Sequence, residues 1–383
     1  MDKVYDKCCG IDVHKKLIVA CFRKGSKQEL RNFGATTREL LELANWLQNG
    51  GCEMVAMEST ASYWKPLYNI LESSELKAMV VNASHMKAVP GRKTDTKDAE
   101  WIAELLQHGL LKASYIPDKQ QRELRELVRY RKSLVSERTR ELNRLQKMLE
   151  GANIKLSGTV SDINCMSARN ILEYLLTGEF FDEAKYDEMY KQKIIAHNLK
   201  ASKEQIIDDL NGVMTPLQRR MMKELLSHLD ELNVHINNLE DEIDNFMKPE
   251  EKQATQAIQD VTGIGKNSSQ AIISVIGTDM SRFPTAGHLA AWAGLCPGNN
   301  ESAQKRKTGK MRKGNALLRS TLVVCAHSAT RNKNSYFYAQ FMRISSHRGK
   351  KRAYVAVAHS MLIAIYHICL LYTSPSPRDY AAS

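Results

Sequence analysis

Two long stretches with helical spacing constrain the fold of this chain more than any other feature. Residues 118–153 are helical and basic, and four leucines share one face: Leu134, Leu142, Leu145 and Leu149. Residues 217–247 form a second helix whose apolar residues step by fours and threes: Leu225, Leu229, Leu232, Ile236, Leu239 and Ile243. This heptad seam fits either a helical hairpin within one chain or a coiled coil between chains. We predict that residues 116–250 are a helical, coiled-coil linker and dimerisation region.

The segment before these helices alternates strand and helix signals. Its order is three strands, a helix, a strand, a helix and a strand, and the first two strands form a hairpin within "CCGIDVHKKLIVACF". This order predicts a mixed α/β sheet over residues 1–115.

The segment after them is mainly helical and punctuated by glycine, and we predict a C-terminal domain over residues 251–372. Residues 354–372 are apolar, long enough for a bilayer and preceded by "HRGKKR". They also contain His359, Ser360 and His367, and no second span exists, so a buried helix of a soluble domain is favoured over a membrane span. Residues 373–383 are expected to be disordered, and their sequence resembles vector- or adapter-derived read-through.

The net charge of the chain indicates which classes of partner it binds. Its 383 residues carry 55 Lys or Arg against 43 Asp or Glu, a net charge of +12. Such a charge on a folded chain points to nucleic acid first and to anionic membrane second. The eight cysteines are scattered without metal-ligand spacing, and the N-terminus lacks a signal-peptide core, so we expect a cytoplasmic protein with free thiols.

Four acidic residues are candidates for a functional site. Asp12 interrupts the apolar run "GIDVH", Glu58 ends the run "VAMEST", and Asp95 and Asp98 share a face at the start of a helix. Taken singly, they read as a turn residue and as ordinary charge at a helix start. Together they can converge on one end of the sheet and hold two Mg²⁺ ions, which suit the cleavage of a phosphodiester. With a basic chain, the expected substrate is nucleic acid.

A glycine turn at residues 261–279 offers a binding site for phosphate. Gly263 and Gly265 precede Lys266 and a helix that ends near Gly277. A G-x-G turn that opens a helix presents backbone N–H groups to a phosphate, as in a helix-hairpin-helix-like element. A plain packing corner between helices is an almost equal alternative.

The stretch "NNESAQKRKTGKMRKGN" contains Ser302 next to a basic run that can neutralise phosphates. The cations predicted to bind nucleic acid here are Lys305, Arg306, Lys307, Lys310, Arg312, Lys313 and, in the following helix, Arg319. A serine becomes a nucleophile only when something activates it. Spacing alone therefore favours a serine that binds phosphate or is idle.

The chain resembles the DEDD-type transposases of insertion-sequence family one-ten, most closely the one-one-one-one subgroup. The resemblance reaches to about Tyr372 and rests on blocks in the same order: "GIDVHK", "AMESTASYW", "KTDTKDAEWIAELL", "TGIGKNSSQAIISVIG", "AAWAGLCPGNNESAQKRKTGK" and "GKKRAYVAVAHSMLIAIYHI".

This resemblance implies a fold and a reaction. It implies a RuvC-like N-terminal domain of RNase H-like fold, with Asp12, Glu58, Asp95 and Asp98 as the DEDD metal ligands, and Ser302 as the nucleophile that forms a covalent 5′-phosphoserine link with DNA. It also implies a bridge-type guide RNA that pairs with donor and target DNA, dimers that assemble into tetramers, and a composite active site. One departure is Ala303, which stands where the family pattern has glycine after the serine.

Two other functions stay open at this stage. A Mg²⁺-dependent, structure-selective nuclease would use activated water, with Ser302 binding phosphate only. A non-catalytic nucleic-acid scaffold would gain nothing from a cluster of four acidic residues, which repels phosphate.

Overall fold

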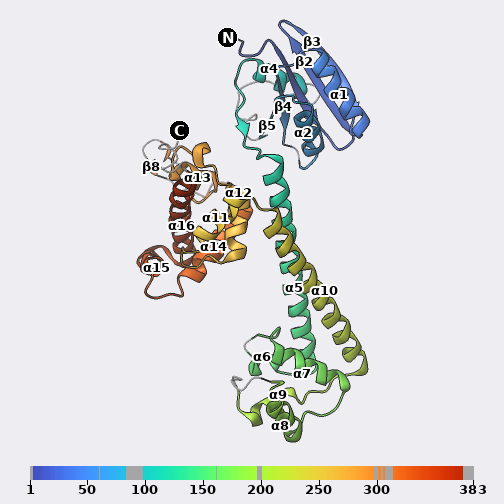
Figure 1. Ribbon diagram of the computed structural model, residues 1–383, viewed down its shortest axis with the longest axis vertical. Helices are drawn as coiled ribbons and strands as arrows, with labels where there is room; N and C mark the ends of the chain where they lie inside the picture. The colour runs from blue at the N-terminus through green and yellow to red at the C-terminus, as the bar shows by residue number, and fades with distance from the viewer. Residues whose placement is uncertain are drawn as a thin grey trace. The chain divides into compact units, whose positions relative to one another are not determined.

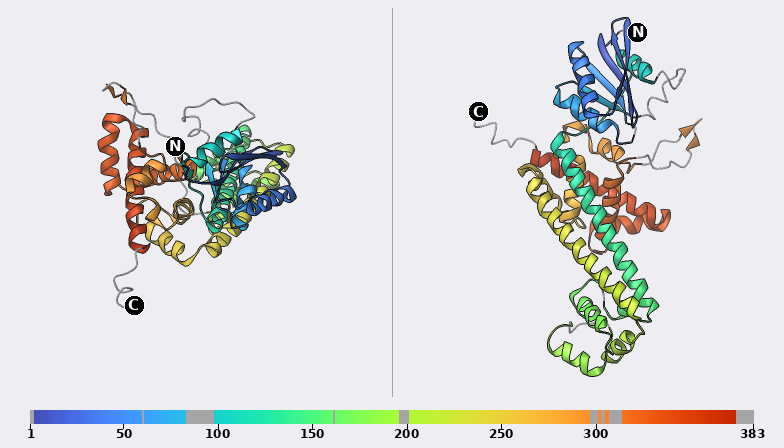
Figure 2. Two further views of the ribbon diagram at one scale, coloured as in Figure 1. Left: turned by 90° about the horizontal axis from the view of Figure 1, so that it is seen from above. Right: turned by 90° about the vertical axis from the view of Figure 1, so that its right-hand side faces the viewer.

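The computed structural model describes residues 3–59, 61–82, 98–160, 162–195, 201–296, 301–302, 305–306 and 314–373 (Figures 1 and 2). The chain divides into two compact units, Met1–Pro117 and Asp118–Ser383. Residues 374–383 of the tail, whose disorder was predicted, lie outside the described residues.

The first unit is built on a six-stranded sheet with the order β3-β2-β1-β4-β5-β6. Its strands are β1 (Lys7–Val13), β2 (Leu17–Lys24), β3 (Lys27–Gly34), β4 (Met54–Glu58), β5 (Ala78–Val81) and β6 (Ala113–Ser114). The first three form an antiparallel meander, β4 and β5 run parallel to β1, and β6 runs antiparallel to β5. The mixed α/β sheet predicted from the sequence is confirmed, with β6 added at its edge.

Helices cover both faces of this sheet. Helices α1 (Thr37–Asn49) and α2 (Trp64–Ser73) share a core with Cys9, Ile11 and Val13 of β1. Helix α4 (Asp98–Gln107) packs on the opposite face, where Ile102 and Leu106 contact Cys8 of β1 and Ala56 of β4. The alternation along β1 follows from the two-residue period of a strand, which sends successive side chains to opposite faces.

The second unit begins with two long helices that pack along each other, α5 (Lys119–Gly151) and α10 (Pro216–Phe246) (Figure 1). Asp118 caps α5 by accepting the backbone N–H of Gln121 at 2.7 Å. Thr215 and Gln218 form a capping box at the start of α10, with Pro216 in the first turn.

The heptad seam of α10 is buried within this chain. Leu232, Ile236 and Leu239 pack against Leu134 of α5, and each is at most 9% exposed. The helical-hairpin alternative therefore describes the seam, and the face that was predicted to join two chains is already covered. One seam residue differs from the prediction: Leu225 is half-buried, and the neighbouring Leu226 takes the core position.

Replacing both Leu232 and Leu239 by aspartate would split an assembly if the seam joined two chains. Because α5 covers both side chains, we expect the double variant to lose at least about 3 kcal/mol of unfolding free energy at each site. Thermal unfolding measures this loss, and Val234→Asp, at a position 57% exposed on the same helix, is the control. A double variant that keeps wild-type stability and halves its solution mass would contradict the hairpin.

Between the long helices the chain forms a small helical subdomain at their far ends. It contains α6 (Leu156–Thr159), α7 (Met166–Thr177), α8 (Glu183–Lys191) and α9 (Lys203–Leu210). Its core includes Leu145 and Leu149 of α5 together with Met222 and Leu226 of α10. The chain then returns to its starting point, where the Lys248 Nζ lies 3.9 Å from a carboxylate oxygen of Asp118.

The last part of the second unit is a helical bundle. Its elements are α11 (Pro249–Ile258), α12 (Lys266–Ile276), the 3₁₀ turn η2 (Met280–Arg282), α13 (Ala286–Trp292), α14 (Ala316–Ala329), α15 (Tyr336–Arg348) and α16 (Lys350–Thr373). In the part of the chain that the structure describes, one helical segment, Lys350–Leu371, is long and apolar enough to cross a membrane. One face of that helix, including Ala353, Val357 and Met361, is buried in the core of the bundle, as predicted for a buried helix.

Candidate catalytic site

Asp12 and Glu58 lie at the carboxyl ends of two neighbouring parallel strands. Ile11 pairs with Met57 in the register of β1 and β4, so the next residues of both strands are neighbours. Asp12 shares its face of β1 with Cys8, and Glu58 shares its face of β4 with Ala56, by the two-residue period. Because Cys8 and Ala56 both pack against α4, the two carboxylates belong to the α4 face of the sheet.

Asp98 comes to the same face because α4 lies directly on β1. A Cβ added to Gly10 would fall 2.4 Å from the Ala99 carbonyl oxygen and 2.2 Å from the Ala103 nitrogen. Only glycine allows the helix backbone to approach this closely. Gly10 precedes Asp12 by two residues, and Ala99 follows Asp98, so the start of α4 is held beside the acidic end of β1. Asp95 lies outside the described residues.

The side chain of His14 also contacts this site. The Nε2 of His14 lies 2.9 Å from a carboxylate oxygen of Asp12, and His14 is exposed whereas Asp12 is buried. Sequence reasoning missed His14 and Gly10, although both stand in the block "GIDVHK". A glycine inside an apolar strand was the available signal, since it marks a close approach by another backbone.

The donor set suits a hard cation. Asp12, Glu58 and Asp98 offer carboxylate oxygen, which Mg²⁺ prefers. Among the described residues, no group of three or more His, Cys, Asp or Glu side chains is close enough together to hold a metal ion. The predicted quartet also includes Asp95, so its fit rests on the shared face and on the chemistry of the donors.

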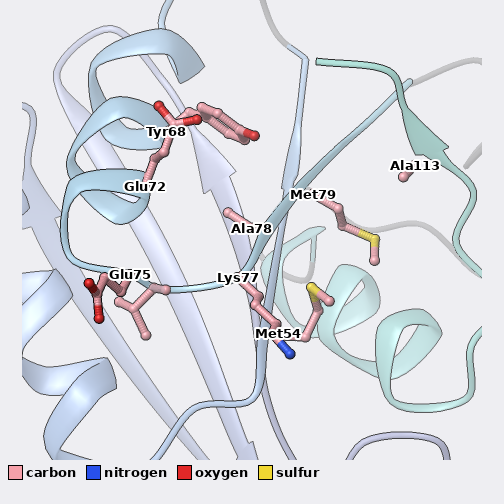
Figure 3. A pocket seen from close by; sticks show the side chains of 9 residues that line it. Met54, Tyr68, Glu72, Glu75, Lys77, Ala78, Met79 and Ala113 are labelled. Atoms are coloured by element: carbon pink, nitrogen blue, oxygen red, sulfur yellow. The ribbon is translucent and has the colours of Figure 1, made fainter. Parts of the chain in front are cut away.

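A pocket of about 500 Å³ in the first unit lies elsewhere. It opens at Met54 and Ala78, the first residues of β4 and β5, and Tyr68 and Met79 give it an apolar lining (Figure 3). Asp12 and Glu58 stand at the other ends of their strands, so this pocket is separate from the acidic face.

The glycine turn lies between α11 and α12, as predicted. Its two glycines, Gly263 and Gly265, have different surroundings. Gly263 has φ +91°, and a Cβ there would fall 2.6 Å from backbone atoms of Cys325 and Ala329 in α14. It therefore packs the turn against α14. Gly265 has no atom within 4 Å of an added Cβ, and no side chain caps the start of α12, so this end is open.

Both ends of α12 are tied to α5 by arginine. Arg125 donates to the carbonyl oxygens of Ser274 and Val275 at the last turn, and burial lowers its pKa to about 10. Arg131 donates to the Asn267 carbonyl oxygen at 3.0 Å at the first turn. Lys266, predicted to bind phosphate, is paired with Asp244 of α10, so a phosphate there would compete with that carboxylate.

Ser302 belongs to a short antiparallel pair of strands rather than to an irregular loop. Strand β7 (Glu301–Ser302) pairs with β8 (Lys305–Arg306), and the register sets Ser302 opposite Lys305. Arg319 stands in the first turns of α14 and is half-buried. Lys307, Lys310, Arg312 and Lys313, also predicted to bind nucleic acid, lie outside the described residues.

None of the eight cysteines forms a disulfide. Burial raises the pKa of Cys8 and of Cys21 to about 11, and that of Cys52 to about 12. These thiols are protonated at neutral pH and are poor nucleophiles.

Two family models match the chain, one over the first unit and α5 and the other over the helical bundle. A model described as "Transposase", of the DEDD type of IS110, matches residues 9–154, from β1 to the end of α5. A model described as "Transposase IS116/IS110/IS902 family" matches residues 255–341, from α11 to α15.

Two proteins are similar over most of their length. The transposase for insertion sequence element IS1111A of Coxiella burnetii is 23% identical over 314 residues, 81% of this chain and 75% of that protein. A probable family 20 transposase of Pseudomonas aeruginosa is 23% identical over 325 residues, 84% of this chain and 80% of that protein.

An α/β sheet that carries Asp12 and Glu58 on one face and a basic helical bundle, each matched by a transposase model, define this chain as a DNA transposase. It belongs to the IS110 family of insertion-sequence transposases, with the DEDD type of N-terminal domain.

Proposed function

We propose that this transposase cuts and rejoins DNA with a Mg²⁺-dependent DEDD site and a serine nucleophile. The observation that carries the proposal is the common face of Asp12, Glu58 and Asp98, reached from two parallel strands and one helix. The antiparallel meander followed by two parallel strands supports an RNase H-like, RuvC-like fold for the first unit. Asp95 completes the proposed quartet.

The residues of this site have distinct roles in the proposal. Asp12, Glu58, Asp95 and Asp98 would hold two Mg²⁺ ions, and these ions supply charge neutralisation at the reacting phosphate. His14 orients the Asp12 carboxylate through their contact of 2.9 Å. Gly10 holds α4 on β1 and so fixes the start of the helix that carries Asp98.

Ser302 carries the group transfer in this proposal. Its Oγ forms a bond to the DNA phosphorus, the bond from phosphorus to the 3′ oxygen breaks, and the 3′ hydroxyl leaves with the proton. The 5′-phosphoserine conserves the energy of the broken phosphodiester, so a second 3′ hydroxyl can rejoin the strand without ATP. The acidic residues belong to the first unit and Ser302 to the second, and we propose that both act on one phosphate, from one chain or two.

The proposed partners are donor DNA, target DNA and a bridge-type guide RNA encoded by the element. The proposed assembly is a homodimer that pairs into a tetramer. Since α5 covers the seam of α10, such an assembly uses surfaces other than that seam.

The serine is tested by denaturing electrophoresis of end-labelled DNA incubated with protein, guide RNA and Mg²⁺. The wild type is expected to give a DNA band that remains linked to protein. Ser302→Ala is expected to bind DNA and RNA nearly as well, because one neutral hydroxyl contributes about 1 kcal/mol to binding. It should give neither the linked band nor the recombined product.

Two different outcomes would contradict the serine nucleophile. A linked band from Ser302→Ala would assign the nucleophile to another residue. Wild-type cleavage to a free 5′ phosphate, without any linked band, would establish the nuclease with activated water instead.

A further inference from the structure

The positive charge of the chain is concentrated in one segment. Residues 302–373 contain fourteen Lys or Arg residues and no Asp or Glu, whereas the whole chain has a net charge of +12. The remainder therefore has two more acidic than basic residues. In the described part, this segment supplies β8 and the helices α14, α15 and α16.

Five cations of this segment gather where α15 meets α16. This surface, here called the basic corner, consists of Arg343, Arg348, Lys350, Lys351 and Arg352. All five are exposed, and none has a carboxylate oxygen within 4.0 Å in the part of the chain that the structure describes. Three of them stand in the first turn of α16, where the helix dipole adds to their mutual repulsion. Such a surface is stabilised by an anionic partner.

Contacts between α15 and α16 hold the basic corner in place, and the turn between the two helices is exposed. Beneath it, the ring of Phe341 of α15 packs against that of Tyr354 of α16, with 4.6 Å between ring centroids and 30° between the ring planes. The Gln340 side-chain amide donates to the Ser360 hydroxyl at 2.8 Å. Gly349 turns the chain between the helices with φ +80°, and a Cβ there would meet no atom within 4 Å. The cations are therefore presented on a fixed frame with free space around the turn.

The basic corner lies at the start of α16, beside α15 (Figure 1). The Tyr366 hydroxyl, near the end of α16, donates to the Phe283 carbonyl at 2.8 Å. Gly314, where the chain leaves the basic stretch, packs against Ala293, which caps the neighbouring helix α13. Arg352 precedes Tyr366 by fourteen residues, about 21 Å along a helix. The corner is therefore separate from the end of α16 that contacts Phe283.

We propose that the basic corner is a second nucleic-acid-binding surface, which holds a sugar–phosphate backbone without reading its sequence. Five cations on two helices match a row of phosphates better than a single anion. Between Arg343 and Arg352 no large apolar side chain is exposed, and the neighbouring Met342, at 49% exposure, offers less apolar surface than insertion into a membrane requires. The proposal rests on a transposase that handles nucleic acid, but not on Ser302 as the nucleophile.

The test removes three charges from the corner and compares salt dependence. The variant is Lys350→Gln, Lys351→Gln and Arg352→Gln. The control, Lys191→Gln, Arg220→Gln and Lys223→Gln, makes the same charge change at exposed cations of α8 and α10. Fluorescence anisotropy measures the binding of a DNA duplex and of a single-stranded RNA over a range of salt.

We expect the corner variant to bind more weakly and to lose about 2 to 3 from the slope of log affinity against log salt, since each duplex phosphate contact contributes about 0.9. The control should keep the wild-type slope. A change with duplex alone assigns the corner to DNA, and a change with RNA alone assigns it to RNA. Both support the proposal, and neither depends on cleavage.

Equal slopes for the corner variant and wild type, with both nucleic acids, would overturn the proposal. So would unchanged nucleic-acid binding with lost binding to phosphatidylserine vesicles, which would assign the corner to a membrane surface. Circular dichroism checks folding. If the triple variant unfolds, Arg343→Gln with Arg348→Gln removes two charges from α15 alone, and the same comparisons decide.

Discussion

Asp12→Asn is expected to lower the rate of DNA strand cleavage on the order of 10³-fold while leaving the fold and RNA binding intact. Asp12 is buried at the end of β1, on the same sheet face as Glu58. An amide is a poorer Mg²⁺ ligand than a carboxylate, and a loss of about 4 kcal/mol of metal-ion stabilisation corresponds to that factor. The side-chain oxygen of asparagine can still accept a hydrogen bond from His14, so the local structure should persist.

The measurement is the single-turnover cleavage rate of end-labelled DNA at several Mg²⁺ concentrations, beside the unfolding midpoint. Asp6→Asn makes the same chemical change at an exposed position of the same unit and should cleave normally. Asp98→Asn should behave as Asp12→Asn does. Full cleavage by Asp12→Asn in Mg²⁺ would refute the assignment of this carboxylate to the reaction.

Gly10→Ala is expected to destabilise the first unit by about 3 kcal/mol and to abolish cleavage with it. The added methyl would fall within 2.4 Å of backbone atoms of α4, and backbone cannot turn aside as a flexible side chain can. Helix α4 must then move away from β1, and Asp98 at its first turn moves with it.

Chemical unfolding measures the stability, and the cleavage assay measures the function. Gly151→Ala is the matched control, because an added Cβ meets nothing within 4 Å there and alanine suits a helix end at least as well. The expected order of stability is therefore Gly151→Ala close to wild type and Gly10→Ala well below. If Gly10→Ala is as stable as wild type, the close approach of α4 to β1 is wrong.

The architecture was predictable where local pattern and packing agree. Strands β1 to β5, helices α1 and α2, and the two long helices all follow from runs of apolar residues with periods of two or of three to four. The glycine turn before α12 was predictable for the same reason, because Gly263 and Gly277 punctuate a helical pattern. Short elements such as β6 have too few residues to show a period.

The arrangement of the site needed long-range information. The sequence identified Asp12, Glu58 and Asp98 as candidates, but their common face depends on the register of β1 with β4. The roles of Gly10 and His14 depend on what lies across from them, which spacing along the chain does not specify. The heptad seam could pack either against a second chain or against α5 of the same chain. The spacing of its leucines does not distinguish these, because both arrangements require the same pattern.

The contact between Asp118 and Lys248 has a consequence for how this protein can vary in length. The chain enters the long helical pair at Asp118 and leaves it at Lys248, with 3.9 Å between the charged atoms. The Gln120 amide also donates to the Phe246 carbonyl at 3.2 Å, so the two ends are tied together. Everything between them is an arm closed at its base. Removing about seven residues from each helix, one heptad, would shorten the arm by roughly 10 Å and keep the seam in register. The length of the arm can therefore change while the parts of the chain joined at its base stay the same.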